Sequence, residues 1–462
     1  MLPKNLHYQN KVESASARAY TAAIQPQGGT GTATNGYTAN NTILINIPTS
    51  PNTVLVPSES YLKFDIGGVT GGGAASSYLR LDKAGAHGVI QRLRVTHGSQ
   101  ELENLDNYGP WVGELMALQQ SSDSIGGKLN VMNGLNFSYL HNNTTKETFP
   151  GLVGERLCPY GAAAANAFAA GAVLAARTYS INLMSLVGSL SPQYIPLFEM
   201  TSAPLTISIQ LVSTALKFLT SETALANAGG FIISNVEFIG SFIELSDDSI
   251  SIIRSSLGGS PLQYVVQSYA NFTTTATLPA AATSVSHPVP AKYASLRSLF
   301  AIMRSQSDGA ITQFAQSSTH FNIIDWKLRI GSQLVPYKSP SSMAEHFSEL
   351  LKAIGSLSDI NHEPTINWNT YATNAIATAN AETYALMNQT TKSDCFALGF
   401  DLETYAAADK DRIFAGMNTL NSDIFWNINF GAQANALNVR FDYYGLYDNV
   451  LVFENGVCYS RR

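Results

Sequence analysis

The sequence predicts an all-β chain with a few short helices, folded as two tandem β-sandwiches of similar size. Three observations lead to this prediction. The 462 residues suit two domains of about 200 residues each. Apolar and polar residues alternate with a period of two in both halves, which is typical of half-buried strands. A strand, a Gly-Ser-Gln turn and a helix occur in the first half, and the same series recurs 233 positions later.

Charged residues are scarce in this chain. Only 13 % of the residues are Asp, Glu, Lys or Arg, and the formal net charge is -6; soluble proteins usually carry about 25 %. A weakly charged surface reduces repulsion between copies and lowers the cost of desolvating a contact. Because the basic residues are scattered, we expect no specific nucleic-acid binding by the folded body.

Three cysteines, Cys158, Cys395 and Cys458, lie far apart and form no CxxC pair. A disulfide framework or a zinc site is therefore not expected. The first twenty residues lack the apolar core of a secretory signal, and no run of about 18 apolar residues occurs anywhere. We therefore expect synthesis in the cytoplasm and no membrane-spanning segment.

The N-terminal region has little capacity to build a core. Residues 25–41 read QPQGGTGTATNGYTANN and consist mainly of Gly, Thr and Asn. Such a composition does not bury enough apolar surface to fold by itself. We predict an extended N-terminal arm over residues 1–40.

Strands are predicted wherever apolar residues occupy every second position. In residues 205–211, for example, Leu and Ile alternate with Thr, Ser and Gln, so one face of the strand is apolar and the other polar. Other segments of this kind are residues 43–47, 61–66, 424–430 and 437–443.

Three helices are predicted. Asn107 can cap a helix that carries Pro110 in its first turn and an apolar stripe around Trp111. Ser342 begins a capping box with Glu345, and that helix ends before a glycine at position 355. A short connecting helix is expected after Ser246, where the carboxylates of Asp247 and Asp248 favour a helix N-terminus over a metal site.

The recurring strand, turn and helix indicate a duplication. Residues 90–100 end in Gly-Ser-Gln, as do residues 323–333, and each turn is expected to form a tight hairpin. The segment Asn-Val-Glu-Phe at 235–238 is echoed by Asn-Val-Arg-Phe at 438–441. We place the seam at residues 257–261, so that the first sandwich spans 41–257 and the second 258–462.

Long polar or alanine-rich stretches interrupt both halves, at residues 121–148, 161–177 and 359–392. In a sandwich, insertions of this kind become loops at the ends or edges of the sheets.

The common catalytic and nucleotide-binding motifs are absent: the sequence has no HExxH, GxSxG or GxxxxGK[ST]. Gly29-Thr30-Gly31 has neither a preceding strand nor a following helix, which excludes a dinucleotide fingerprint. Four weaker candidates have more ordinary explanations. The pairs His97 with Glu101 and Asp82 with His87 are better explained as polar hairpin residues. The pair His346 with Glu349 is better explained as ordinary surface, and Cys158 as a free structural thiol.

Two further groups leave alternatives open. Tyr443, Tyr444, Tyr447 and Tyr459 gather near the C-terminus, where they can form a sugar-binding platform, a subunit interface or simply core. Glu101 and Glu103 point the same way along a predicted strand, as a glycosidase pair requires, but nothing else marks them as catalytic. We assign no catalytic, cofactor-binding or metal-binding residue.

Three segments carry a resemblance to a known family. They are residues 60–66 (SYLKFDI), 88–99 (GVIQRLRVTHGS) and 105–109 (LDNYG). Their series resembles the major capsid proteins of virophages and Polinton-like viruses, which belong to the double jelly-roll lineage of adenoviruses and tectiviruses. The resemblance is strongest over residues 60–120.

The resemblance implies two tandem jelly-roll sandwiches in a structural protein without enzymatic activity or cofactor. It implies a homotrimer of pseudo-hexagonal outline, a hexon, which contacts neighbouring capsomers, pentons and minor capsid proteins in an icosahedral virion. The arm, with Lys4, Lys11 and Arg18, would touch neighbours, a membrane or the genome. Open alternatives are a carbohydrate-binding viral spike or attachment protein, a glycoside-active enzyme and a phage tail or tube protein.

Overall fold

The computed structural model describes most of the chain. The described residues are 17–72, 79–141, 148–154, 170–191, 193–221, 230–306, 316, 318–359, 364–366, 371–372, 395–404, 415–433 and 435–462.

The first half forms two antiparallel sheets that face each other across an apolar core. One has the order β1-β13-β3-β10, with β9 also paired to β3, and the other has the order β2-β11-β5-β6. Their strands are β1 (Ala17–Ile24), β2 (Thr42–Ile47), β3 (Thr53–Gly67), β5 (Ile90–His97), β6 (Gln100–Asp106), β9 (Arg177–Ile181), β10 (Ile195–Pro196), β11 (Leu205–Leu211) and β13 (Ile232–Leu245).

The second half repeats this arrangement. Its sheets have the orders β14-β21-β16-β19, with β22 paired to β21, and β15-β20-β17-β18. Their strands are β14 (Leu262–Leu278), β15 (Thr283–Val289), β16 (Leu296–Ser305), β17 (Ile323–Ile330), β18 (Gln333–Val335), β19 (Ala397–Asp401), β20 (Ile424–Phe430), β21 (Leu437–Glu454) and β22 (Val457–Arg461).

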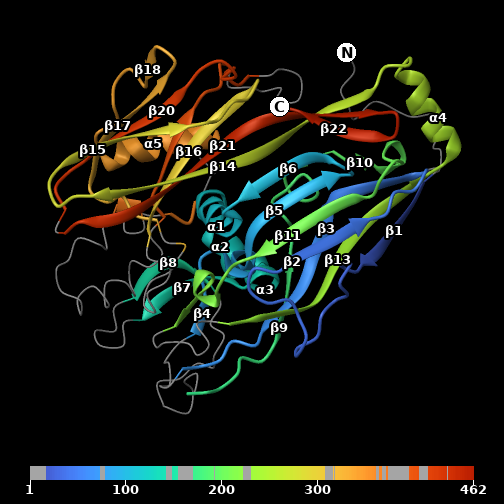
Figure 1. The fold of residues 1–462 in the computed structure, drawn as a ribbon, viewed down its shortest axis with the longest axis horizontal. Helices are drawn as coiled ribbons and strands as arrows, with labels where there is room; N and C mark the ends of the chain where they lie inside the picture. Colours follow the sequence, from blue (N-terminus) through green and yellow to red (C-terminus); the bar gives the residue numbers. More distant parts are fainter. Residues whose placement is uncertain are drawn as a thin grey trace, which may run out of the picture.

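The two halves correspond strand by strand. The series β1-β13-β3-β9 has its counterpart in β14-β21-β16-β19, and β2-β11-β5-β6 has its counterpart in β15-β20-β17-β18. All strand pairs among the described residues lie within one half, and the predicted seam falls in the turn between α4 (Asp247–Ser256) and β14. Figure 1 shows the two sets of strands side by side, blue to green and yellow to red, with α1 (Tyr108–Gln119) at their boundary.

Both predicted hairpins are present. His97 pairs with Gln100 across Gly98-Ser99, and Ile330 pairs with Gln333 across Gly331-Ser332. Gly98 and Gly331 have φ angles of 57° and 59°, a region that glycine enters without steric cost and that two-residue hairpin turns require. The glycine of the recurring Gly-Ser-Gln is therefore a backbone requirement.

Two of the predicted helix starts are confirmed and one differs. Ser342 accepts a hydrogen bond from the Glu345 N–H at the start of α5 (Met343–Ile354), and Ser246 caps α4 through the Ser249 N–H. Asn107 precedes α1 as predicted but has a φ of 49° and does not cap it. Its side chain is used elsewhere, as described below.

Part of the predicted arm belongs to the first sheet. All eight residues of β1 pair with β13, from Ala17 opposite Leu245 to Ile24 opposite Phe238. The backbone of β13 supplies this pairing, so β1 needs no apolar face of its own and reads as a polar arm in the sequence. Residues 1–16 lie outside the described residues.

The first predicted loop also contains regular structure. Within residues 121–148 the chain forms α2 (Ser122–Gly126), α3 (Lys128–Asn133) and β7 (Leu135–His141), which pairs with β8 (Thr148–Gly154). Much of the other two predicted loops lies outside the described residues. The remaining elements are β4 (Leu79–Leu81), which pairs with β12 (Leu219–Ser221), and the short 3₁₀ helices η2 (Gly85–Val89), η4 (Leu197–Glu199) and η5 (Ala215–Lys217).

Buried apolar side chains from both halves form one contiguous cluster. The predicted alternation holds: Ile43, Ile45 and Ile47 are buried on β2, as are the Leu and Ile residues of β11. Among the residues that the structure describes, none of the helices has the length and apolar character needed to traverse a bilayer.

Candidate functional site: the interface between the two halves

Aromatic rings join the two halves. Trp111, on α1 of the first half, is fully buried. Its indole stacks on the ring of Tyr444 on β21, with centroids 4.4 Å apart and planes 11° apart. The rings of Tyr269 and Phe300, on β14 and β16, lie 5.2 and 5.1 Å from it. The apolar stripe predicted on α1 thus packs against the outer face of a sheet in the other half.

Beside these rings, Asn107 links the halves by hydrogen bonds. Its side-chain amide donates to Asn271 Oδ1 at 2.8 Å and to Thr273 Oγ1 at 3.1 Å. Its Oδ1 accepts from Arg440 at 2.7 Å, and its backbone carbonyl accepts from the Tyr444 hydroxyl at 3.0 Å. The left-handed backbone at Asn107 directs these groups toward the second half rather than toward the helix.

Asp442 is the charged centre of this network. It is fully buried, and its carboxylate accepts hydrogen bonds from Arg304 Nε at 2.9 Å and Arg440 Nε at 3.1 Å. Burial alone would raise the pKa of Asp442, but the guanidinium groups of Arg304 and Arg440 hold it below its usual value. The carboxylate is therefore ionised, and a buried ionised group requires partners of this kind.

A second polar cluster includes Glu114, which lies one turn after Trp111 on α1. Lys83 Nζ and Glu114 Oε2 are 2.5 Å apart, and both side chains are buried. Glu114 also accepts from the hydroxyl of Ser318, which belongs to the second half, at 3.1 Å. Next to them, Gln316 accepts from the Ala84 N–H at 3.0 Å. These contacts hold the segment before β17 against the first half.

The hairpin β5–β6 makes a third set of contacts. Glu103 on β6 accepts hydrogen bonds from Ser185 and from Ser268 of the second half, the latter at 2.7 Å. Burial raises the pKa of Glu103, and these hydrogen bonds oppose the rise. In addition, the Asn449 side chain donates to the Leu102 carbonyl at 3.0 Å. Neutral and charged hydrogen bonds therefore occur along the whole interface. Another orientation of the halves would leave these buried groups unpaired, so the interface is specific for this one.

The pair His97 and Glu101 belongs to this interface and does not form an acid/base site. The Cys458 N–H donates to His97 Nδ1 at 3.0 Å, so Nε2 carries the proton and donates to the Ala203 carbonyl at 3.0 Å. Glu101 accepts from Arg94 at 2.7 Å. One ring nitrogen of His97 therefore holds the C-terminal strand, and the other holds the segment before β11.

Asp82 and His87 also have separate partners. Asp82 accepts from the N–H groups of Lys83 and Gln316, and burial raises its pKa to about 6. His87 is buried, and burial lowers its pKa to about 3. Its nitrogens lie 3.1 Å from the Tyr108 hydroxyl and 3.4 Å from the Asn133 amide nitrogen.

His87 gives a pH dependence that can be measured. Because its pKa is lower in the folded chain than in the unfolded one, the unfolded state binds one more proton between pH 6.5 and about 3. The contribution of neutral His87 to the free energy of unfolding is therefore complete above pH 6.5. It is lost on acidification, by about 1.4 kcal/mol per pH unit. In His87→Gln this loss is absent. Unfolding free energies measured in urea between pH 6.5 and 4.5 should fall less steeply for the variant, and equal slopes would contradict the assignment.

His346 and Glu349 do not form a ligand pair. His346 is buried and accepts from the Trp326 indole N–H at 3.2 Å, whereas Glu349 pairs with Lys352 on the surface at 2.6 Å. The interpretation of both as surface residues is therefore wrong for His346, which faces the core beside Trp326.

The tyrosines near the C-terminus do not form a sugar platform. Tyr443, Tyr444 and Tyr447 are buried, in contact with His287, Trp111 and Tyr293 respectively. Tyr459 is half-buried and hydrogen bonded to Glu454 at 3.2 Å. Of the glutamates considered as a glycosidase pair, Glu103 is buried in the interface, and Glu101 lies near its rim with Arg94 and Arg462.

The remaining candidates are structural or not described. Gly31 and Thr30 accept hydrogen bonds from β13 through their backbone carbonyls. Asp247 lies in the first turn of α4 and accepts from Asn52 at 2.7 Å, as the helix interpretation predicts. Cys158 lies outside the described residues. Among the described residues, no group of three or more metal-ligating side chains comes together.

Comparison with solved structures places this arrangement in a known group. A chain of the Sputnik virophage structure matches with 13 % identity and a TM-score of 0.60, over 100 % of this chain and 92 % of that one. The mavirus major capsid protein matches with 11 % identity and a TM-score of 0.56, over 100 % and 93 %. The PBCV-1 virus capsid gives 10 % identity and a TM-score of 0.56, over 98 % and 99 %.

No family model and no curated protein matches the sequence. The likeness is therefore one of fold, and it extends over nearly the full length of both chains in each comparison. Together with the strand-by-strand correspondence of the halves, it shows that this chain has the double jelly-roll fold of viral major capsid proteins.

Proposed function

We propose that the chain is a major capsid protein, without enzymatic activity, and that three copies form a capsomer of pseudo-hexagonal outline. The observation that carries the proposal is the internal interface. The first half contributes its hairpin β5–β6 and α1, and the second half contributes side chains of β14, β21 and β16. Two different surfaces meet, so the contact is heterologous.

Each of these two contact surfaces has a counterpart in the other half, and the counterparts do not contact each other within one chain. The counterpart of β5–β6 is the hairpin β17–β18, and the counterparts of β14, β21 and β16 are β1, β13 and β3. The second half of one copy can therefore meet the first half of the next as the halves meet within a chain. A heterologous contact repeated in this way forms a ring if its rotation closes, and six sandwiches from three copies give a six-cornered ring.

The side chains of the second hairpin support this assembly. Leu334 is 55 % exposed, and Tyr337, just after β18, is 99 % exposed. Apolar groups gathered on one exposed edge are typical of a contact surface. The corresponding hairpin in the first half is covered by β14 and β22.

Light scattering with negative-stain imaging tests the assembly. We expect a particle of three times 49.6 kDa with a six-cornered outline. A monomer, or a ring of another symmetry such as that of a phage tube, would contradict the proposal.

A surface variant locates the contact. In Leu334→Lys/Tyr337→Lys we expect dissociation to monomers, because two unpaired charges would be buried at the contact. The chain itself should stay folded, since exposed substitutions usually change stability by less than about 0.5 kcal/mol. Val131→Lys is the control, because Val131 is 82 % exposed on α3. A double variant that remains a trimer would place the contact elsewhere.

The wider setting follows from the same proposal. Capsomers would contact one another, pentons and minor capsid proteins in an icosahedral virion, after synthesis in the host cytoplasm. The scattered basic residues and the net charge of -6 favour protein contacts over genome binding by the folded body. Within the part of the chain that the structure describes, the attachment-protein alternative loses its support, since the tyrosines that suggested it are mostly buried.

A further inference from the structure

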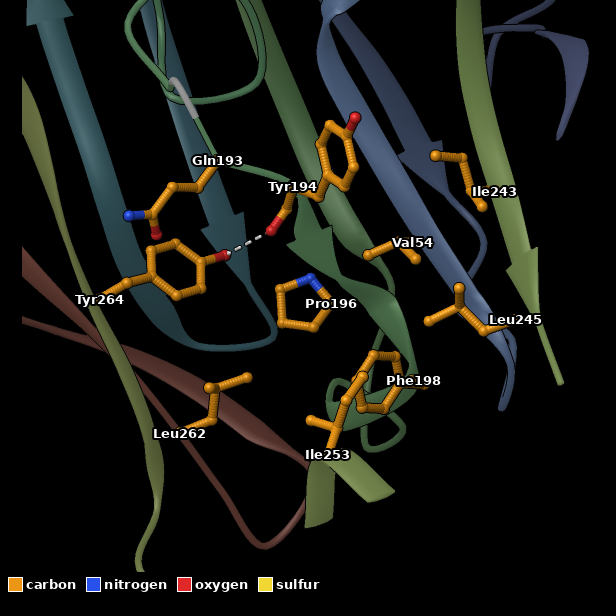
Figure 2. Close-up of a pocket in the computed structure, with 10 residues that line it drawn as sticks. All are labelled: Val54, Gln193, Tyr194, Pro196, Phe198, Ile243, Leu245, Ile253, Leu262 and Tyr264. Atoms are coloured by element: carbon orange, nitrogen blue, oxygen red, sulfur yellow. Dashed lines mark hydrogen bonds between the residues drawn. The ribbon is translucent and has the colours of Figure 1, made fainter. Parts of the chain in front are cut away.

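An apolar groove lies where the first sheet, α4 and β14 come together (Figure 2). Its volume is about 290 Å³. Among the described residues, the side chains that line it are all uncharged, and they belong to Val54, Gln193, Tyr194, Pro196, Phe198, Ile243, Leu245, Ile253, Leu262 and Tyr264. Apolar surface of this kind stays in contact with water unless another group covers it.

The walls of the groove belong to different halves of the chain. Ile243 and Ile253 are on β13 and α4 of the first half, whereas Leu262 and Tyr264 are on β14 of the second. The Tyr264 hydroxyl donates to the carbonyl of Tyr194 in the first half at 3.3 Å, as the dashed line in Figure 2 marks. The complete groove therefore exists only when the two halves are closed against each other.

The contact within the chain indicates where the hairpin β17–β18 of a neighbouring copy would lie. The carbonyl of Leu102, on the hairpin β5–β6, accepts a hydrogen bond from Asn449 on β21 at 3.0 Å. Counted along the matching Asn-Val-x-Phe segments at 235–238 and 438–441, Asn449 corresponds to Ser246. Ser246 directly follows Leu245, which lines the groove. A hairpin that is placed on the first half in the same way thus reaches the groove.

Tyr337 is the side chain of that hairpin region that suits the groove. Counted from the two turn glycines, Leu102 corresponds to Val335, and Tyr337 stands two residues further along the chain. Tyr337 is 99 % exposed in the single chain. A tyrosine ring contributes a large apolar area and a polar tip, which suits a contact between proteins. The amide of Gln193 gives the apolar lining a polar group that such a tip can meet.

We propose that the groove receives Tyr337 of a neighbouring copy, and that assembly thereby selects chains whose two halves have already closed. The inference rests on the proposed capsomer and adds the surface that the neighbour recognises. Neither half alone presents both walls, so a chain with open halves buries less of the aromatic ring and binds it more weakly. Closure of the halves and recruitment of the next copy are therefore coupled.

Disulfide trapping between copies tests the position of Tyr337. Tyr337→Cys is combined with Ile253→Cys in one wall or with Leu262→Cys in the other, and each double variant is mildly oxidised. A disulfide requires Cα atoms about 4.4–6.8 Å apart. We therefore expect both double variants to give linked chains of two or three times 49.6 kDa.

The matched controls place the second cysteine at the exposed neighbours Ile252 and Gln263, which lie outside the lining. Combined with Tyr337→Cys, Ile252→Cys and Gln263→Cys should each give at least about tenfold less linked product, because their side chains lie outside the groove. The single variant Tyr337→Cys measures any linkage to the native cysteines.

Light scattering on the same samples distinguishes a failure of the groove contact from a failure of the capsomer. Trimers without linked chains beyond the controls would leave the capsomer in place and overturn the groove contact. Linkage through only one wall would overturn the coupling between closure and recruitment. A disulfide within one chain would show that the groove is filled from its own chain and would also overturn the inference. Wild-type monomers would overturn the proposed function and this inference together.

Charges placed in the groove give a second measurement. Ile253→Asp and Leu262→Asp should each raise the protein concentration at which half of the capsomers dissociate by at least about tenfold, because a charge would be buried at the contact. Ile252→Asp and Gln263→Asp should leave it within about twofold, as exposed substitutions usually do. Circular dichroism verifies that each variant is folded. An unchanged dissociation concentration in a folded Leu262→Asp would show that the wall from the second half is not used, and would overturn the coupling.

Discussion

Trp111→Ala is expected to lower the free energy of unfolding by about 3–5 kcal/mol, the range for truncating a buried Trp. The indole fills the space between the halves and contacts the rings of Tyr269, Phe300 and Tyr444. Alanine would leave a cavity lined by those three rings, which are anchored on strands and cannot close it. Urea unfolding followed by circular dichroism measures the loss.

Trp111→Phe is the matched control for that variant. A phenyl ring keeps an aromatic face against Tyr444 and removes less volume, so its effect should be less than half that of alanine. If the alanine variant lies within about 1 kcal/mol of the wild type, the indole does not hold the halves together, since typical single mutations already cost that much.

Asp442→Leu is expected to lower the free energy of unfolding by about 3–5 kcal/mol, as removal of one partner of a buried ion pair does. The substitution removes the counter-charge of Arg304, which is itself buried, and of Arg440. It also removes the carboxylate that accepts a hydrogen bond from Thr273 at 2.7 Å. Because these groups are shielded from solvent, the loss should change little between 0.05 and about 0.5 M salt.

The double variant Arg304→Met/Asp442→Leu separates the pair from its surroundings. Replacement of both charged groups by apolar ones of similar size is often close to neutral, so the double variant should recover much of the stability that Asp442→Leu loses. Comparison of the two single variants with the double one gives the interaction energy. A double variant less stable than Asp442→Leu would show that the stability lost in Asp442→Leu comes from packing rather than from the unpaired charge of Arg304.

The elements of this fold were predictable where local chemistry determines them. Gly98 and Gly331 mark two-residue turns because only such residues enter the required φ region cheaply. Ser342 and Gly355 delimit α5 because they satisfy its end groups. The alternation in β11 follows from one buried face. Comparison of these local signals also predicted two similar halves, and the strand orders of the halves correspond.

What the sequence did not predict depends on contacts between distant residues. Asn107 looked like a helix cap, since the positive φ that turns its amide toward Asn271 and Asp442 leaves no trace in the local pattern. Strand β1 looked like an arm because its pairing uses only backbone groups. His346 and Glu349 looked like neighbours on a helix, but their surroundings are set by Trp326 and by solvent.

The interface between the halves could not be predicted from local sequence patterns either. Trp111 was predicted to be apolar and inward, but its partners lie more than 150 positions away on three strands of the other half. Lys83 and Glu114 carried no signal, because buried ion pairs arise where two surfaces are pressed together and follow no fixed spacing.

The short turn between α4 and β14 affects how quickly such a particle can form. It ties the halves together through five residues, 257–261, so their contact forms within one molecule and does not weaken on dilution. In the proposed ring, every second contact is of this tethered kind. Assembly then requires three molecules to meet, whereas a ring of separate sandwiches would require six. The assembly rate therefore depends on a lower power of the protein concentration. Two sandwiches on one chain, joined by a short turn, thereby convert half of a multi-body encounter into protein folding.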